Sequence, residues 1–138
     1  MLANDADRLL VTAIGGSHLL QPPLTWLLSR RLGLKSTFQG LPPLSGAITG
    51  NMALASVALP TTLGVWLAVH SEHAFSAGPV RQIAVLLGLF WCWRLARQLG
   101  ALRRVWGPAH RGWLLGLALI FVVQGPLLLA LLARGDWP

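Results

Sequence analysis

Few side chains in this 138-residue chain are suited to metal binding or catalysis, and the densest group of them is His70, Glu72 and His73. The two histidines would lie one turn apart if the segment were helical. Imidazole and carboxylate groups bind zinc, but a closed site needs three or four ligands in a fixed geometry. Because the remaining histidines belong to other predicted elements, we predict a solvated loop here and no metal site.

His18 is the histidine that lies within an apolar segment, and an imidazole at membrane depth is a candidate axial ligand for haem or a chlorophyll-type pigment. Ligation by two histidines needs a second one at similar depth, whereas His70, His73 and His110 lie at predicted helix ends. We therefore predict no cofactor. A haem- or pigment-binding membrane subunit that uses His18 stays as an alternative.

Acid–base and nucleophilic chemistry have little support in the sequence. The carboxylates are Asp5, Asp7, Glu72 and Asp136, which lie near the chain ends or in a loop, so no pair of them is expected in one pocket. No glycine-rich phosphate loop followed by lysine is present. The single cysteine, Cys92, excludes an intrachain disulfide and a zinc site built from several cysteines. We predict that the protein is not an enzyme.

The composition indicates a membrane protein rather than a soluble one. Charged residues make up 11% of the chain and hydrophobic residues 54%, whereas soluble domains have about 25% charged residues. The net charge is +7, but the basic residues flank long apolar runs, so we expect contacts with lipids and no binding of nucleic acid. The preference for Arg over Lys, with many Ala, Gly, Leu and Pro residues, suggests a bacterial protein of the cytoplasmic (inner) membrane.

We predict an all-α integral membrane protein, a small helical bundle whose single domain covers residues 1–138, with three transmembrane helices over about 46–69, 80–99 and 113–133. Pro60 should kink the first span, and Gln124-Gly125-Pro126 should interrupt the last one.

The N-terminal region, 1–45, is harder to place. Polar residues and the Pro22-Pro23 pair favour two short helices, about 6–20 and 23–33, in an interfacial or re-entrant segment. A fourth span over this region is the alternative, since neighbouring helices tolerate proline and polar groups.

The distribution of basic residues predicts the orientation. One side of the three-span arrangement carries nine of the eleven Arg and Lys residues, and Arg81 and Arg134 lie on the other. The side with the excess is expected to be cytoplasmic, which places loop 94–111 inside and the C-terminus outside. A fourth span would move residues 1–8 outside. The residues predicted to contact lipid phosphates or other anionic groups are Arg30, Arg31, Arg97, Arg103, Arg104 and Arg111.

Small residues at spacing four suggest how the helices pack. In lipid, close approach of helix backbones matters more than burial of apolar surface, and small residues permit it. The predicted packing residues are Gly46, Gly50, Gly64, Ala84, Gly88, Cys92, Ala96, Gly100, Gly112 and Gly116.

Three spans have few neighbours within one chain, so some of these faces are expected to contact other transmembrane subunits. We therefore predict a small non-catalytic subunit, with an accessory, structural or assembly role in a larger inner-membrane complex. A homo-oligomeric channel or facilitator lined by Asn51, Thr61, Thr62 and Gln124 is an alternative. No motif is specific enough to name a family.

Overall fold

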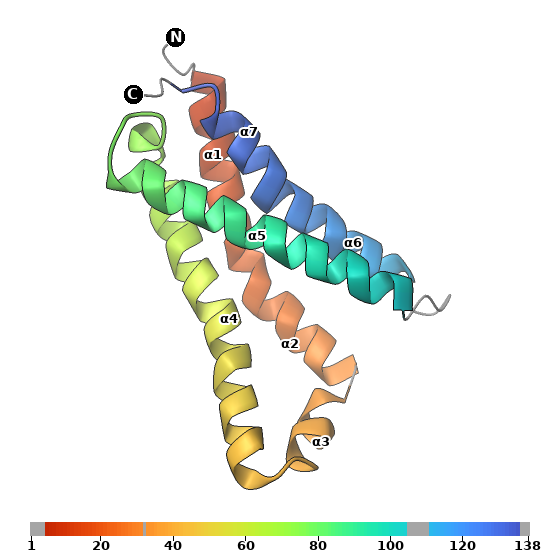
Figure 1. The fold of residues 1–138 in the computed structure, drawn as a ribbon. Helices are drawn as coiled ribbons and strands as arrows, with labels where there is room; N and C mark the ends of the chain where they lie inside the picture. The colour runs from red at the N-terminus through yellow and green to blue at the C-terminus, as the bar shows by residue number, and fades with distance from the viewer. Residues whose placement is uncertain (1–4, 32, 105–110, 136–138) are drawn as a thin grey trace.

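The computed structural model describes residues 5–31, 33–104 and 111–135, and its regular elements are all helices or helical turns. Four runs of helix make up the described part of the chain, with the start of the first helix and the end of the last one at the top of Figure 1. The all-α prediction is therefore confirmed for these residues.

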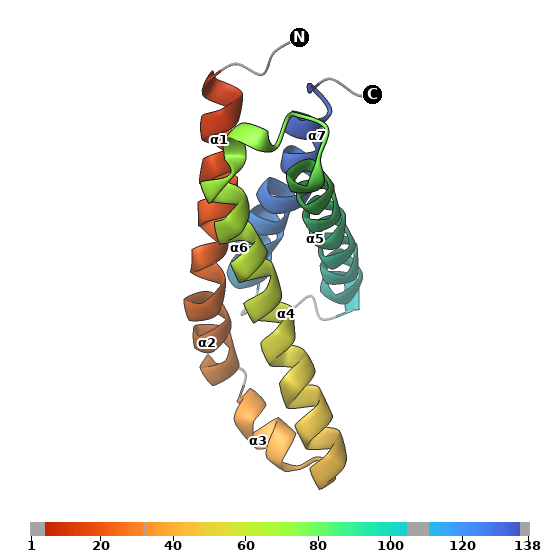
Figure 2. The same cartoon turned by 90° about the vertical axis from the view of Figure 1, so that its left-hand side faces the viewer.

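Residues 5–31 form one run of helical segments beside helix α4 (Pro43–Val69). Its parts are α1 (Asp5–Ser17), the 3₁₀ turn η1 (His18–Leu20) and α2 (Gln21–Arg31), and they follow one another down the side of α4 (Figures 1 and 2). Pro22 and Pro23 lie in the first turn of α2, where the backbone N–H groups have no partner within a helix. The prolines therefore begin a helix here. The predicted interruption is present, but it is the tighter turn at His18–Leu20.

A short connector joins this run to the longest helix. Gly33 has φ 61°, a conformation that favours glycine, and it precedes α3 (Leu34–Gln39). Helix α4 (Pro43–Val69) then returns toward the top of the molecule with Pro60 inside it. The hydroxyls of Thr61 and Thr62 donate to the carbonyls of Val57 and Ala58, as expected for side chains that support the backbone around a proline.

The second half of the chain is an antiparallel pair. Helix α5 (Pro79–Arg104) follows the 3₁₀ turn η2 (Ser71–His73) and runs diagonally across Figure 1. Helix α6 (Arg111–Val122), the π-helical turn η3 (Val123–Leu127) and α7 (Leu128–Leu132) form the returning line. Pro126 lacks the N–H that an α-helix would use, and the wider π turn accommodates it, so the predicted interruption of this helix is confirmed.

In the part of the chain that the structure describes, two stretches of helix are long and apolar enough to cross a membrane, namely Pro43–Val69 and Leu115–Leu132. Only 17% of the apolar stretch in α4 is buried, whereas the core helix of a soluble protein would be mostly buried. The 27 residues of α4 measure about 40 Å, more than the roughly 30 Å of a bilayer core. Helix α5 has sufficient length but carries Arg81, Arg94 and Arg97, so its transmembrane position stays a prediction.

The four runs of helix pack together at the top of Figure 1 and diverge toward its lower half. The apolar core includes Val11 and Ile14 of α1, Leu67 of α4, Trp91 of α5 and three leucines of α7. Below this core, the α2–α3–α4 arm and the α5–α6 arm diverge in Figure 1. The buried residues therefore concentrate at one end, and the arms leave grooves between them.

Candidate functional site

A buried cluster of uncharged polar side chains lies where α1, η1, α4, α5 and η3 meet. Its central residue is His18, whose exposed fraction is 0%, and Gln124 of η3 is buried to the same degree. Gln21 is 7% exposed and Trp91 only 1%. Burial of polar groups is costly unless they are hydrogen-bonded, so the partners of these side chains determine what the cluster does.

Both ring nitrogens of His18 have hydrogen-bond partners. The indole Nε1–H of Trp91 donates to Nε2 over 2.7 Å. The other nitrogen, Nδ1, lies 2.9 Å from the carbonyl oxygen of Ile14 and 3.2 Å from that of Gly15. Carbonyl oxygens only accept, so Nδ1 carries the hydrogen and Nε2 accepts. His18 is thus a neutral imidazole, because a second ring hydrogen would face the indole N–H.

A second chain of hydrogen bonds joins the N-terminal helices to the π turn. The Gln21 amide donates to Gln124 Oε1 over 2.8 Å, and the Gln124 amide donates to Ser17 Oγ over 3.0 Å. The Ser17 hydroxyl then donates to the Ile14 carbonyl over 2.6 Å. The Ile14 carbonyl oxygen therefore accepts from both Ser17 and His18. The cluster therefore ties α5 and the α6–η3–α7 run to one carbonyl group of α1.

Three glycines allow this approach. A Cβ on Gly64 would lie 2.3 Å from His18 Cγ, so the imidazole rests directly on the backbone of α4. A Cβ on Gly15 would lie 2.6 Å from the Gly64 carbonyl oxygen. A Cβ on Gly125 would lie 2.8 Å from the backbone nitrogen of Cys92. The hydrogen bonds and the close backbone contacts therefore lie in the same part of the molecule. We refer to the five hydrogen-bonded side chains together as the polar clamp, namely His18, Trp91, Gln21, Gln124 and Ser17.

The clamp bears on the cofactor and channel hypotheses. An axial haem or pigment ligand needs a ring nitrogen with an open lone pair, but Nε2 of His18 accepts from Trp91 and Nδ1 carries a hydrogen.

The residues considered as a channel lining do not meet within one chain. Gln124 is buried in the clamp, whereas Asn51 and Thr62 lie exposed on the surface of α4.

The predicted packing residues divide into two groups. Ala84, Gly88 and Cys92 of α5 and Gly64 of α4 lie against other helices of the chain; a Cβ on Gly88, for instance, would lie 2.7 Å from Leu129 Cδ2. Ala96 is exposed, and Gly46 is half-buried. The remaining glycines, which have nothing within 4 Å of an added Cβ, are Gly50, Gly100, Gly112 and Gly116.

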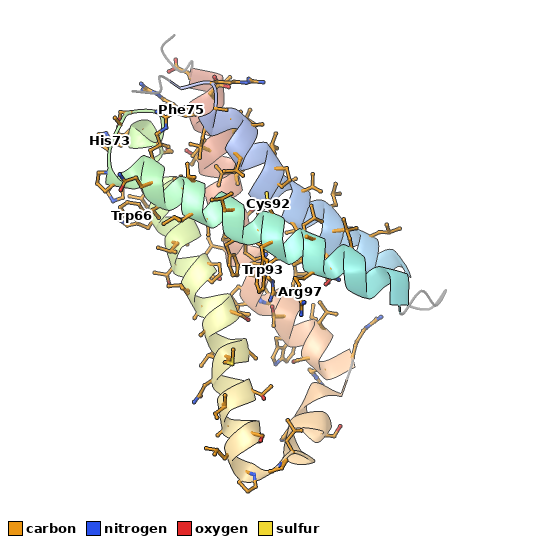
Figure 3. The ribbon with its side chains drawn as sticks, in the orientation of Figure 1. Trp66, His73, Phe75, Cys92, Trp93 and Arg97 are labelled. Carbon is orange, nitrogen blue, oxygen red and sulfur yellow. The ribbon has the colours of Figure 1, made fainter. Side chains whose placement is uncertain are left out.

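Of the two predicted loop histidines, His73 is exposed (labelled in Figure 3) and His70 is half-buried. His73 Nε2 lies 3.3 Å from Glu72 Oε1, but both side chains are more than half exposed. The ring of His70 instead contacts Trp66, with 4.9 Å between ring centroids. Among the described residues, no group of three or more potential ligands is close enough to hold a metal ion.

Most of the basic residues lie on the parts of the helices that diverge below the core (Figure 1). Arg30 and Arg31 end α2, Arg103 and Arg104 end α5, and Arg111 begins α6. The Arg30 guanidinium lies 4.8 Å from the centre of the Trp26 ring, and Arg97 is exposed on α5. Arg8, by contrast, is on α1 at the upper end, where Arg134 Nη1 lies 3.2 Å from Asp7 Oδ1.

Two apolar grooves lie between the arms. One has a volume of about 370 Å³ and runs between Leu24 and Leu28 of α2 and the α6 residues from Gly112 to Ile120. The other has a volume of about 380 Å³ and runs between α4 and α5.

The sequence pointed to His18 and Gln124 as separate candidates, with no contact predicted between them. No polar contact of Trp91 or Gln21 was predicted from the sequence. The sequence does contain a signal that His18 and Gln21 share one buried helix face. Residues at intervals of three and four are all buried along this face, namely Asp7, Val11, Ile14, His18 and Gln21.

Comparison with protein-family models, curated proteins and solved structures finds no match to this chain.

Proposed function

We propose that this chain is a four-span protein of a bacterial cytoplasmic membrane and serves as a non-catalytic subunit of a larger membrane complex. In this proposal the line from α1 to α2 is the additional span, and it takes the place of the interfacial segment expected from the sequence. The polar clamp fixes it to the other spans.

The membrane placement rests on an inverted distribution of polarity around η1. His18 and Gln21 are buried, whereas Leu19 and Leu20 between them are 59% and 55% exposed. A water-soluble helix would show the opposite arrangement. In lipid, apolar side chains face outward, while polar groups hydrogen-bond between helices. Leu9 and Trp26, which are 72% and 56% exposed, extend the apolar outer surface along the same line.

The charges support one orientation of these spans. Arg8, Arg81 and Arg134 lie at the upper end together with Asp5, Asp7 and Glu72, so the described charges there balance. The remaining eight basic residues lie away from the upper end, on α2, α3, the second half of α5 and the first residue of α6. The excess of Arg and Lys favours a cytoplasmic position for the lower end, with both chain ends outside.

The observation that carries the proposed function is the groove between α2 and α6. Gly112 and Gly116 line it one turn apart, both are exposed, and a Cβ on either would have nothing within 4 Å. Small residues are useful in lipid where a second helix approaches closely. The clamp, meanwhile, uses its polar groups in bonds within the chain. A helix-docking surface without reactive side chains fits a subunit better than an enzyme.

The experiment is native mass spectrometry of the affinity-purified protein, released from its own membranes in a mild detergent. The wild-type chain is expected with a membrane partner in fixed stoichiometry. Gly116→Leu would fill the groove and should lower recovery of that partner at least tenfold. Leu115→Phe is the matched control, because Leu115 is exposed on α6 but does not line the groove. Recovery of the wild-type chain as a lone monomer, or an unchanged partner yield for Gly116→Leu, would contradict the proposal.

A further inference from the structure

The groove between α4 and α5 differs from the one between α2 and α6 in its lining. Helix α5 contributes Leu86, Leu87 and Phe90, and α4 contributes residues between Ala55 and Leu63, including Pro60. These α5 side chains are large, so the backbone of another helix cannot approach α5 closely there. The groove is therefore suited to a thin, flexible apolar group more than to a helix.

One face of α5 continues from this groove to a cation. At 100° per residue, Leu86, Phe90, Trp93 and Arg97 lie within about 60° of one another around the helix. Trp93 is 57% exposed and Arg97 is exposed. Figure 3 shows the Trp93 and Arg97 side chains leaving the same lower edge of α5. The face thus passes from aliphatic to aromatic to cationic as it nears the basic end of the molecule.

This order of side chains matches a phospholipid in the membrane. Acyl chains lie in the apolar interior, tryptophan favours the interface, and arginine binds phosphate with several N–H donors. The distance fits as well. The rise from Leu86 to Arg97 is about 16 Å along α5, close to the roughly 15 Å of one bilayer leaflet.

We propose that the α4–α5 groove binds one acyl chain of an anionic phospholipid of the cytoplasmic leaflet, with the phosphate at Arg97 and the glycerol region beside Trp93. The charge of the lower end favours an anionic headgroup over a zwitterionic one, because the remaining described basic residues there add to the potential at Arg97. This site rests on the proposed membrane placement, but it is separate from the α2–α6 groove and from the polar clamp.

The test is native mass spectrometry of the full chain in detergent with added phosphatidylglycerol or phosphatidylcholine of identical acyl chains. We expect one phosphatidylglycerol to stay bound under collisional activation that removes phosphatidylcholine. Arg97→Gln should lower phosphatidylglycerol occupancy about fivefold, the effect of one basic residue near an anionic surface. Arg8→Gln is the matched control, because Arg8 is exposed at the opposite end of the molecule. This variant should bind as much phosphatidylglycerol as the wild type.

A second variant tests the groove without altering charge. Ser56→Leu adds volume to the α4 wall and should lower the occupancy of both lipids, with circular dichroism showing that the helix content is kept. The lipid site is overturned if Arg97→Gln binds phosphatidylglycerol like the wild type, or if both lipids bind equally well. Release of the protein from membranes by alkaline carbonate would instead overturn the membrane placement, so the two failures are distinguishable.

Discussion

Replacing Trp91 by phenylalanine should weaken the fold by removing one hydrogen-bond donor from the polar clamp. In the wild-type protein the indole donates to His18 Nε2 over 2.7 Å, and the His18 side chain has no exposed surface. Phenylalanine keeps an aromatic ring opposite Phe121, which stacks on Trp91 with 5.0 Å between centroids. The main loss is therefore the bond to His18, which leaves Nε2 as a buried acceptor without its donor.

The cost follows from two comparisons. A buried polar group left unsatisfied costs about 1–3 kcal/mol in water-soluble proteins, whereas hydrogen bonds between membrane helices average about 0.6 kcal/mol and reach about 1.7 kcal/mol. The short distance and complete burial place this bond toward the upper part of the membrane range. We expect Trp91→Phe to lower the free energy of unfolding by about 1–2 kcal/mol, or roughly a tenfold change in the unfolding constant.

Equilibrium unfolding in mixed micelles of dodecyl sulfate and maltoside, followed by circular dichroism, measures this difference. Trp93→Phe is the control, because Trp93 is 57% exposed, and its effect should be close to zero. A double-mutant cycle with His18→Leu isolates the pairwise term. We expect a coupling of about 1 kcal/mol between positions 18 and 91. Additive effects of the two substitutions would refute the assignment of a hydrogen bond between these side chains.

Two further predictions concern close contacts of the fold. Gly64→Ala should destabilise the protein by about 1–3 kcal/mol in the same assay, since a Cβ there would lie 2.3 Å from His18 Cγ. Gly50→Ala on the same helix, with nothing within 4 Å of the new Cβ, should be neutral or slightly stabilising, and equal effects of the two changes would contradict the packing. Arg134→Gln should cost less than about 1 kcal/mol, because Arg134 is 66% exposed in its ion pair with Asp7. That small difference should vanish in high salt, and a loss that persists at 1 M salt would show that Arg134 acts by packing and not by charge.

The sequence was sufficient for the helical class and for the two most apolar helices. Long uncharged runs over 46–69 and 113–133 coincide with α4 and the α6–α7 line because length and hydropathy determine such helices locally. The interruption at Pro126 is likewise a local property of proline. The structure adds the form of that interruption, a π turn that directs Gln124 inward.

In the N-terminal region, the break predicted at the Pro22-Pro23 pair is found just before it, at the 3₁₀ turn η1 (His18–Leu20). Pro22 and Pro23 lie in the first turn of α2, where proline is tolerated. The buried series from Asp7 to Gln21 continues through η1 with helical spacing, which predicts one packed face across the interruption.

The partner of that face could not be predicted. The Trp91 bond to His18 joins residues 73 positions apart, and it depends on how α5 is rotated about its axis. A single sequence defines which faces of a helix carry polar or small residues, but several other helices of the chain could pack against the same face. For the same reason, the division of the predicted small residues into internal contacts at Gly64 and Gly88 and open positions at Gly112 and Gly116 required the structure.

The placement of α1–η1–α2 as a membrane span is tested most directly by the side of the membrane on which α1 begins. In a Cys92→Ser background, Ala6→Cys and Ser76→Cys place a thiol at exposed positions of the upper end, and Lys35→Cys places one at the lower end. A membrane-impermeant maleimide applied to intact cells, with the outer membrane permeabilised, should label positions 6 and 76 together. Position 35 should react only after the cytoplasmic membrane is opened. Protection of position 6 in intact cells, with position 76 still labelled, would contradict the four-span arrangement and favour an N-terminus on the cytoplasmic side.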